Sequence, residues 1–203
     1  MLATLGILVL TFIGVAILLP RGGSLPPRTN LEPPSENGLR ASLAIAVDGR
    51  LLKATSSGLF HSADGGQTWE PMQLPRRLAA SGVAHLAVNP EAPAVIYAAG
   101  RDAGVLLSED NGTSWRRVTT GLPSLDVEAL AMHAFRRKTL FVSVRGKGVY
   151  RTEDGGRQWE RMDGGPPGKS ALVLAHSRLE GSMNTGWLYA GTLEGPYLSM
   201  DCF

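Results

Sequence analysis

The chain has 203 residues, and its 20 lysines and arginines against 18 aspartates and glutamates give a formal net charge of +2. A charge this close to zero argues against a disordered polyelectrolyte and against a protein that coats nucleic acid. The 25 glycines and 13 prolines favour many turns over long helices, and a lone cysteine, Cys202, excludes an internal disulfide framework.

The first predicted element is a membrane-spanning helix over residues 1–20. Residues 2–19 carry no charge, and as a helix they reach roughly 27 Å, close to the hydrocarbon thickness of a bilayer. A cleaved signal peptide is the alternative, although the segment has no basic start and no clear cleavage site follows it. A buried helix of a soluble core is disfavoured because the run has no polar face.

Small residues of this helix offer surfaces for close packing against neighbouring membrane helices. These residues are Gly6, Thr11, Gly14 and Ala16. The helix also makes membrane lipid an expected partner. Positive charges follow it at Arg21, Arg28 and Arg40, which favours a cytoplasmic domain, but a large following domain can be translocated despite such charges.

Residues 21–40 form a predicted linker. Pro-Pro pairs at 26–27 and 33–34 favour extended polyproline segments, which act as semi-rigid spacers. We therefore expect the linker to hold the following domain away from the membrane surface.

Residues 41–203 contain four repeats with a common motif, in which Ser or Thr is followed by Asp, then Gly and, in three repeats, Trp. The motif residues are Ser62, Asp64, Gly66 and Trp69; Ser108, Asp110, Gly112 and Trp115; Thr152, Asp154, Gly156 and Trp159; and, in the shortened fourth repeat, Ser199 and Asp201. The four aspartates lie 46, 44 and 47 residues apart. A fixed period of this length is typical of stacked supersecondary units.

Each repeat contains short apolar runs separated by glycines, which predicts antiparallel strands. The expected first strands are 43–47, 83–88, 128–132 and 171–175, and the expected second strands are 51–54, 95–99, 140–144 and 188–192. Third strands open at Gly58, Gly104, Gly148 and Gly195, and the tryptophans open the fourth. Four strands in a unit of about 45 residues are typical of a propeller blade.

The motif itself predicts a tight corner between the third and fourth strands. The Asp carboxylate can accept backbone N–H groups, the Gly can take a left-handed backbone, and the Trp ring can pack back onto the sheet. Because turn chemistry accounts for these residues, we expect them to be structural.

These repeats resemble Asp-box (BNR) repeats, which occur in sialidases, sortilin-type receptors and the photosystem II stability/assembly factor propellers. The resemblance covers residues 41–203. It implies an all-β, Asp-box propeller-like domain of about four four-stranded blades behind one transmembrane helix. The fourth blade lacks its outer strand, so either the linker donates that strand or the ring stays partial and a partner covers its edge.

No catalytic, cofactor-binding or metal site is expected. A sialidase of this family needs an arginine triad, a Tyr–Glu pair and a further acid, and neither Glu128 nor Glu194 is paired with a tyrosine by spacing. The tyrosines are interpreted as core or rim residues: Tyr97, Tyr150, Tyr189 and Tyr197. The histidines occupy different positions within the repeats, which argues against a metal site: His61, His85, His133 and His176. We therefore expect that the chain is not an enzyme.

Basic clusters occur at 76–77, 116–117 and 136–138. They indicate either a solvated surface or contact with lipid head groups or an acidic protein. Nucleic acid is not expected as a partner, because no aromatic residues alternate with the basic ones.

Resemblance to the photosystem assembly factors implies a non-catalytic, membrane-anchored scaffold that docks onto, stabilises or helps to assemble a larger membrane complex. Photosynthetic reaction-centre subunits are the partner it suggests. The alternatives are a membrane-tethered, sialidase-like carbohydrate-active or carbohydrate-binding protein, and a sortilin-like peptide receptor. Because Asp-box domains of these families lie outside the cytoplasm, we expect a single-pass membrane protein with a periplasmic or otherwise extracytoplasmic β-domain.

Overall fold

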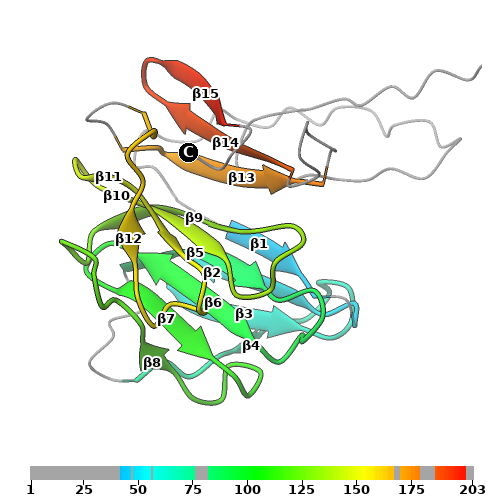
Figure 1. Cartoon of the computed structure of the whole chain (residues 1–203). Coiled ribbons are helices and arrows are strands. Elements are labelled where there is room, and N and C mark those ends of the chain that lie inside the picture. The colour runs from blue at the N-terminus through cyan, green and yellow to red at the C-terminus, as the bar shows by residue number, and fades with distance from the viewer. Residues whose placement is uncertain are drawn as a thin grey trace, which may run out of the picture.

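The computed structural model describes residues 42–46, 48–55, 57–75, 82–166, 170–178 and 186–199. These residues form four antiparallel sheets, numbered sheet 1 to sheet 4 in chain order (Figure 1). Sheets 1 to 3 have four strands, and sheet 4 has three within the described residues. The expected all-β architecture of blade-like sheets is confirmed.

In every sheet the strands follow one another in chain order. Sheet 1 comprises β1 (Ser42–Ile45), β2 (Leu51–Thr55), β3 (Gly58–Ser62) and β4 (Glu70–Pro71). Sheet 2 comprises β5 (Val83–Val88), β6 (Ile96–Gly100), β7 (Gly104–Ser108) and β8 (Arg116–Arg117). Sheet 3 comprises β9 (Val127–Met132), β10 (Leu140–Val144), β11 (Gly148–Thr152) and β12 (Glu160–Arg161). Sheet 4 comprises β13 (Val173–Ser177), β14 (Trp187–Thr192) and β15 (Gly195–Ser199).

The expected membrane helix, with Gly6, Thr11, Gly14 and Ala16, and the expected linker lie outside the described residues. The same holds for Asp201 of the fourth motif. Across the ranges that are described, no helix has the length and apolar character needed to cross a bilayer.

The first strand of sheet 4 starts two residues later than expected, at Val173 rather than at residue 171. Ala171 is fully buried, and its N–H donates to the Ser143 hydroxyl at 2.7 Å. Because Ser143 belongs to sheet 3, this contact holds Ala171 against the neighbouring sheet before strand pairing begins.

Tight glycine turns join the second and third strands of each sheet. Gly104 shows why glycine is required, because its φ is +67° and an added Cβ would lie 2.6 Å from the Thr119 side chain and 2.9 Å from that of Leu125. A side chain there would therefore be strained and would push the sheet 2 turn away from the segment leading to sheet 3.

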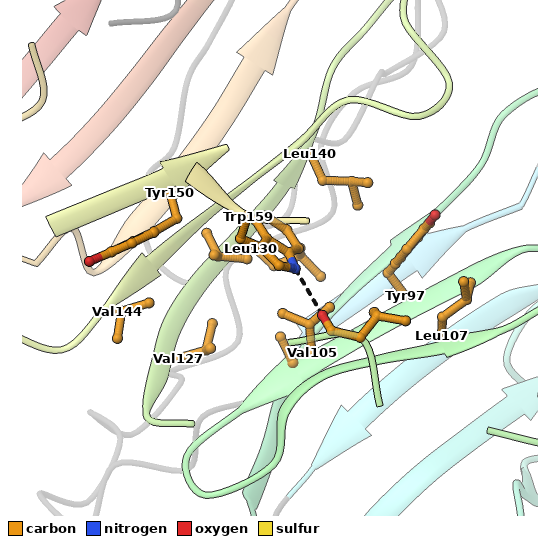
Figure 2. Packing of buried hydrophobic residues seen from close by; sticks show 12 residues of the cluster. Tyr97, Val105, Leu107, Val127, Leu130, Leu140, Val144, Tyr150 and Trp159 are labelled. Carbon is orange, nitrogen blue, oxygen red and sulfur yellow. Dashed lines mark hydrogen bonds between the residues drawn. The ribbon is translucent and has the colours of Figure 1, made fainter. Parts of the chain in front are cut away.

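Adjacent sheets pack face to face, and the first strands β1, β5, β9 and β13 lie beside one another in turn. We call the face of a sheet that meets the preceding sheet its front and the other its back. Between sheets 2 and 3, back-face residues such as Tyr97 and Val105 meet front-face residues such as Leu130, Val144 and Tyr150 (Figure 2). Similar apolar layers fill the junctions of sheets 1 and 2 and of sheets 3 and 4.

The connections between strands lie on two rims. The motif corners share one rim with the loops between first and second strands, since Asn111 N–H donates to Ala94 O and Gly155 N–H to Lys138 O. We call this the Asp-box rim. The glycine turns share the other rim with the segments between sheets, since Gly104 N–H donates to Leu125 O and Arg145 N–H to Asp126 O. We call this the turn rim.

Candidate functional site

The motif corner of sheet 1 is closed by one hydroxyl and one carboxylate. The Ser62 hydroxyl donates to Asp64 Oδ1 at 2.7 Å and accepts the Gly66 N–H at 2.8 Å. The Asp64 carboxylate then accepts the Thr68 N–H at 2.9 Å and the Thr68 hydroxyl at 2.6 Å. The corners of sheets 2 and 3 repeat this pattern around Ser108 and Asp110 and around Thr152 and Asp154.

These hydrogen bonds favour the charged form of each aspartate. Bonds from Thr68 and Ser62 lower the pKa of Asp64, and bonds from Ser114 and Ser108 lower the pKa of Asp110 to about 2. The Thr152 hydroxyl lowers the pKa of Asp154 in the same way. The carboxylates are therefore ionised at neutral pH and are engaged by their own turns.

The motif tryptophans attach the corners to the sheets. The indole N–H groups of Trp69 and Trp115 donate to Gly66 O and Gly112 O of their own turns, each at 3.0 Å. Trp159 instead donates across the sheet junction to Val118 O at 2.8 Å, the dashed line in Figure 2. Ser199 of the fourth motif is buried at the end of β15.

A different group of side chains gathers on the turn rim at the start of β9. Val127 pairs with Val144 and Ala129 with Ser143, so Glu128 is the extra residue of a β-bulge. Bulges change the direction of a side chain and are common beside functional sites. Glu128 is buried, and its Oε2 accepts no hydrogen bond from the described residues.

Arg145 joins two carboxylates in this group. Its Nη2 lies 2.9 Å from Glu128 Oε1 and its Nε lies 2.9 Å from Asp126 Oδ2. Arg101, from the turn of sheet 2, places Nε 3.6 Å from Asp126 Oδ1. Two carboxylates and two guanidinium groups from adjacent sheets therefore form one charged cluster, Asp126, Glu128, Arg101 and Arg145, which we call the rim cluster.

The rim cluster has free capacity for a ligand. This capacity lies in its cations, because Glu128 Oε2 is buried, whereas the exposed side chain of Arg101 is only loosely engaged at 3.6 Å. Lys147, in the same turn as Arg145, adds an exposed ammonium group. The exposed cations can therefore bind a polar group that accepts hydrogen bonds from a guanidinium or an ammonium group.

Two histidines stack at the junction of sheets 3 and 4. The rings of His133 and His176 are 4.0 Å apart, and both stack near Phe141. Burial, with His176 and Arg136 nearby, lowers the pKa of His133 to about 4, and burial also lowers the pKa of His176. Both rings are therefore neutral at physiological pH.

The other residues considered from sequence lie apart from the rim cluster. Tyr97 and Tyr150 are buried at the junction of sheets 2 and 3, whereas Tyr189 is exposed. Glu194 lies in the last glycine turn, where its N–H donates to Thr192 Oγ1. Arg116 pairs with Glu109 and Arg137 with Glu91. Within the described ranges, no three His, Cys, Asp or Glu side chains are arranged to hold a metal ion.

Sequence reasoning considered Glu128 alone and missed the rim cluster. Asp126 and Glu128 flank the first residue of a strand, and Arg101 and Arg145 fall in equivalent turns of two successive repeats. Aligning these turns across the repeats would have placed the two arginines beside the acidic pair.

A sequence model of the photosynthesis system II assembly factor YCF48 family matches residues 42–170, more than half of the chain. The chain belongs to this family. The expected Asp-box propeller resemblance, with the photosystem assembly factors as its nearest branch, is therefore confirmed.

Curated and solved proteins extend the comparison. The oligoxyloglucan-reducing end-specific xyloglucanase of Emericella nidulans is 31% identical over 92 residues, which are 43% of this chain and 11% of that protein. A GH74 xyloglucanase from Xanthomonas campestris has the same fold, with a TM-score of 0.64 at 20% identity over 81% of this chain and 29% of its own. YCF48 bound to D1 peptide gives a TM-score of 0.52 at 15% identity, over 76% of this chain and 47% of its own.

The expectation that the chain is not an enzyme is corrected by these relatives. Two curated proteins similar to this chain in sequence are xyloglucanases, and GH74 enzymes share its fold. The sequence argument tested only the residues of a sialidase. Glycosidase chemistry of another kind uses other carboxylates, which that argument did not consider.

Proposed function

We propose that the chain is a membrane-anchored binding subunit that holds a segment of a larger membrane complex, with photosynthetic reaction-centre subunits as the partner class. Membership of the YCF48 family over residues 42–170 is the observation that carries this proposal. The peptide-bound YCF48 structure adds a neighbour of the same fold whose partner is a D1 peptide.

The turn rim is the face best suited to hold such a segment. The carboxylates of the Asp-box rim are engaged by their own turns, whereas the turn rim presents the exposed cations Arg101 and Lys147. An extended peptide can meet these groups with its backbone amides and with acidic side chains or a terminal carboxylate.

Co-purification from detergent-solubilised native membranes tests the proposal. We expect the chain to co-migrate with reaction-centre subunits in a native gel, and Arg101→Glu to reduce this recovery at least several-fold. Arg136→Glu on the Asp-box rim is the matched control and should leave recovery unchanged. Recovery without any subunit of a membrane complex would refute the proposal.

The anchor and the compartment are parts of the same proposal. The uncharged run at residues 2–19 supports a retained helix, and the family resemblance supports an extracytoplasmic β-domain. Protease added to intact spheroplasts should then cleave the β-domain. Cleavage only after lysis would place the domain in the cytoplasm.

A carbohydrate-active function is the second candidate, supported by the xyloglucanase relatives and by the paired carboxylates of the rim cluster. Glycosidases use two carboxyl groups on either side of the scissile bond. Release of reducing sugar from xyloglucan oligosaccharides is the assay, with Glu128→Gln and Asp126→Asn as variants. Activity that both substitutions abolish would favour this candidate, and activity that survives them would exclude the rim cluster as its site.

A further inference from the structure

The two end sheets each leave one apolar face uncovered by the described residues. The front face of sheet 1 presents Leu43, Ile45 and Phe60, with Trp69 beside them. The back face of sheet 4 presents three exposed apolar side chains, Val173, Tyr189 and Leu198. Repeat domains normally end in units with a polar outer face, so two apolar end faces need a partner.

Residues at the equivalent positions of the other sheets are buried in the junctions between sheets. Leu43 is 36% exposed, whereas Leu86, Leu130 and Leu174 at the same front position are 9%, 8% and 7% exposed. Tyr189 is 38% exposed, whereas Leu52, Tyr97 and Phe141 at the same back position are 0%, 3% and 0% exposed. Both end faces therefore have the side chains of a sheet junction without the adjoining sheet.

We propose that a second copy of this chain covers both faces. The front of sheet 1 in each copy packs on the back of sheet 4 in the other, and the two copies close into one ring around a two-fold axis. The ring contains twice the four sheets of one chain. That number falls within the range of about four to eight blades typical of propellers.

A second copy is favoured because one uncovered face is a front and the other is a back, which are the two kinds of face that pack together within the chain. All three junctions within the chain join a back face to the front face of the next sheet. The described sheets leave one uncovered front and one uncovered back, so a second copy of the chain supplies both missing partners.

The repeat equivalence also assigns the register of the new junction. Within the chain, the Tyr97 hydroxyl donates to Gly155 O in the motif corner of the next sheet at 3.3 Å. Tyr189 occupies the Tyr97 position, and Gly65 occupies the Gly155 position. In the ring, the Tyr189 hydroxyl of one copy therefore donates to Gly65 O of the other.

On its front face, sheet 1 has Lys53 where the other three sheets have alanine or valine. The equivalent residues are Ala98, Val142 and Ala190. Its ammonium group lies 4.0 Å from the Trp69 ring centre and 5.3 Å from that of Phe60. The charge is thus held against the aromatic rings of its own sheet, and the aliphatic stem remains available for packing.

The mass of the full-length chain in mild detergent tests the proposal, by light scattering after size exclusion at micromolar concentration. We expect a dimer for the wild type and a monomer for both Leu43→Glu and Tyr189→Asp. Phe135→Asp is the matched control, because Phe135 is an exposed apolar residue outside both end faces and its variant should stay dimeric. Circular dichroism verifies that each variant keeps its β-sheet signal.

Each other result overturns the proposal. A monomeric wild type means that another segment or another protein covers the faces. If Tyr189→Asp stays dimeric, the two copies associate through the front faces of sheet 1 or through the membrane helix. A series of larger species means that the copies add end to end and do not close into a ring. Tyr189→Phe should raise the dimer dissociation constant several-fold, because each junction loses one hydrogen bond. An unchanged constant would refute the Gly65 register.

Discussion

Ser108 shows how much of this fold depends on single hydroxyl groups. The side chain is buried, donates to Asp110 and accepts the buried Gly112 N–H at 2.7 Å. We expect Ser108→Ala to lower the free energy of unfolding by about 1–3 kcal/mol, because the Gly112 N–H would lose its partner away from water.

Urea denaturation of the purified chain measures this loss. Thr113→Ala on the exposed side of the same corner is the control, and it should change stability by less than about 0.5 kcal/mol. Equal effects of the two substitutions would contradict the role assigned to the buried hydroxyl.

The stacked histidines predict a pH dependence of stability at the junction of sheets 3 and 4. Burial, with His176 and Arg136 nearby, lowers the pKa of His133 from 6.5 to about 4, and Nδ1 of the neutral ring accepts the N–H groups of Phe135 and Arg136. Between these two pH values the unfolded chain binds more protons than the folded chain. The free energy of unfolding should therefore fall as pH drops from about 6.5 to about 4, by up to about 3 kcal/mol.

Urea denaturation at about pH 7 and about pH 5 measures this slope. The His133→Asn variant keeps an acceptor for the two backbone N–H groups but cannot titrate. Its stability should depend less on pH over this interval than that of the wild type. If the free energy of unfolding of this variant depended on pH as strongly as that of the wild type, other titrating groups would be responsible.

At the scale of elements, the bulge in β9 and the turn of β10 and β11 create the rim cluster together. Arg145 is the only residue of the cluster that contacts both carboxylates in the described structure. We expect Arg145→Ala to lower the free energy of unfolding by about 2–4 kcal/mol, because the buried Glu128 carboxylate would lose its cation.

Arg101→Ala is the matched control for this prediction. Its guanidinium group is exposed and lies 3.6 Å from Asp126, so its loss should cost less than about 1 kcal/mol. Thermal unfolding of both variants separates the two cases. If Arg101→Ala proved the more costly substitution, the assignment of Arg145 as the bridging residue would fail.

Most strands and turns were predictable from the sequence, because each is determined by residues that are close together in the chain. Gly104 and Gly148 mark hairpins that other residues would strain, and the apolar runs between them have the short length of strands. The bulge at Glu128 was not predictable in this way, because it depends on which residues of β10 lie opposite β9. The start of β13 was misplaced for the same reason, since the Ala171 contact with Ser143 joins two sheets.

On the scale of the whole molecule, the sheets should differ in stability along the chain. Among the described residues, sheets 2 and 3 pack on both faces, whereas sheets 1 and 4 pack on one. In the monomeric Leu43→Glu variant we expect the slowest amide hydrogen exchange in β6 and β10 and the fastest in β1 and β15, because end units open with less loss of buried surface.

Hydrogen exchange followed by mass spectrometry gives this profile. In the wild-type chain, the difference in exchange rate between the central strands and the end strands should be smaller if the end faces are covered as proposed. Uniform protection in the Leu43→Glu variant would mean that the four sheets open as a single unit.

Sequence reasoning could not locate the candidate site at this scale. The motifs that identified the fold are its corners, and they contain no spare chemistry because each carboxylate binds its own turn. Arg101 and Glu128 of the rim cluster belong to segments with no motif, and only the stacking of two sheets brings them together.

The separation of the two rims has a consequence for how such chains diverge. In the three described corners, the hydroxyls and aspartates that close the turns lie on the Asp-box rim, so substitutions or insertions in the loops of the turn rim leave these hydrogen bonds intact. The recognised molecule can therefore change while the architecture stays constant. This independence offers a physical reason why YCF48 and GH74 xyloglucanases can have the same fold.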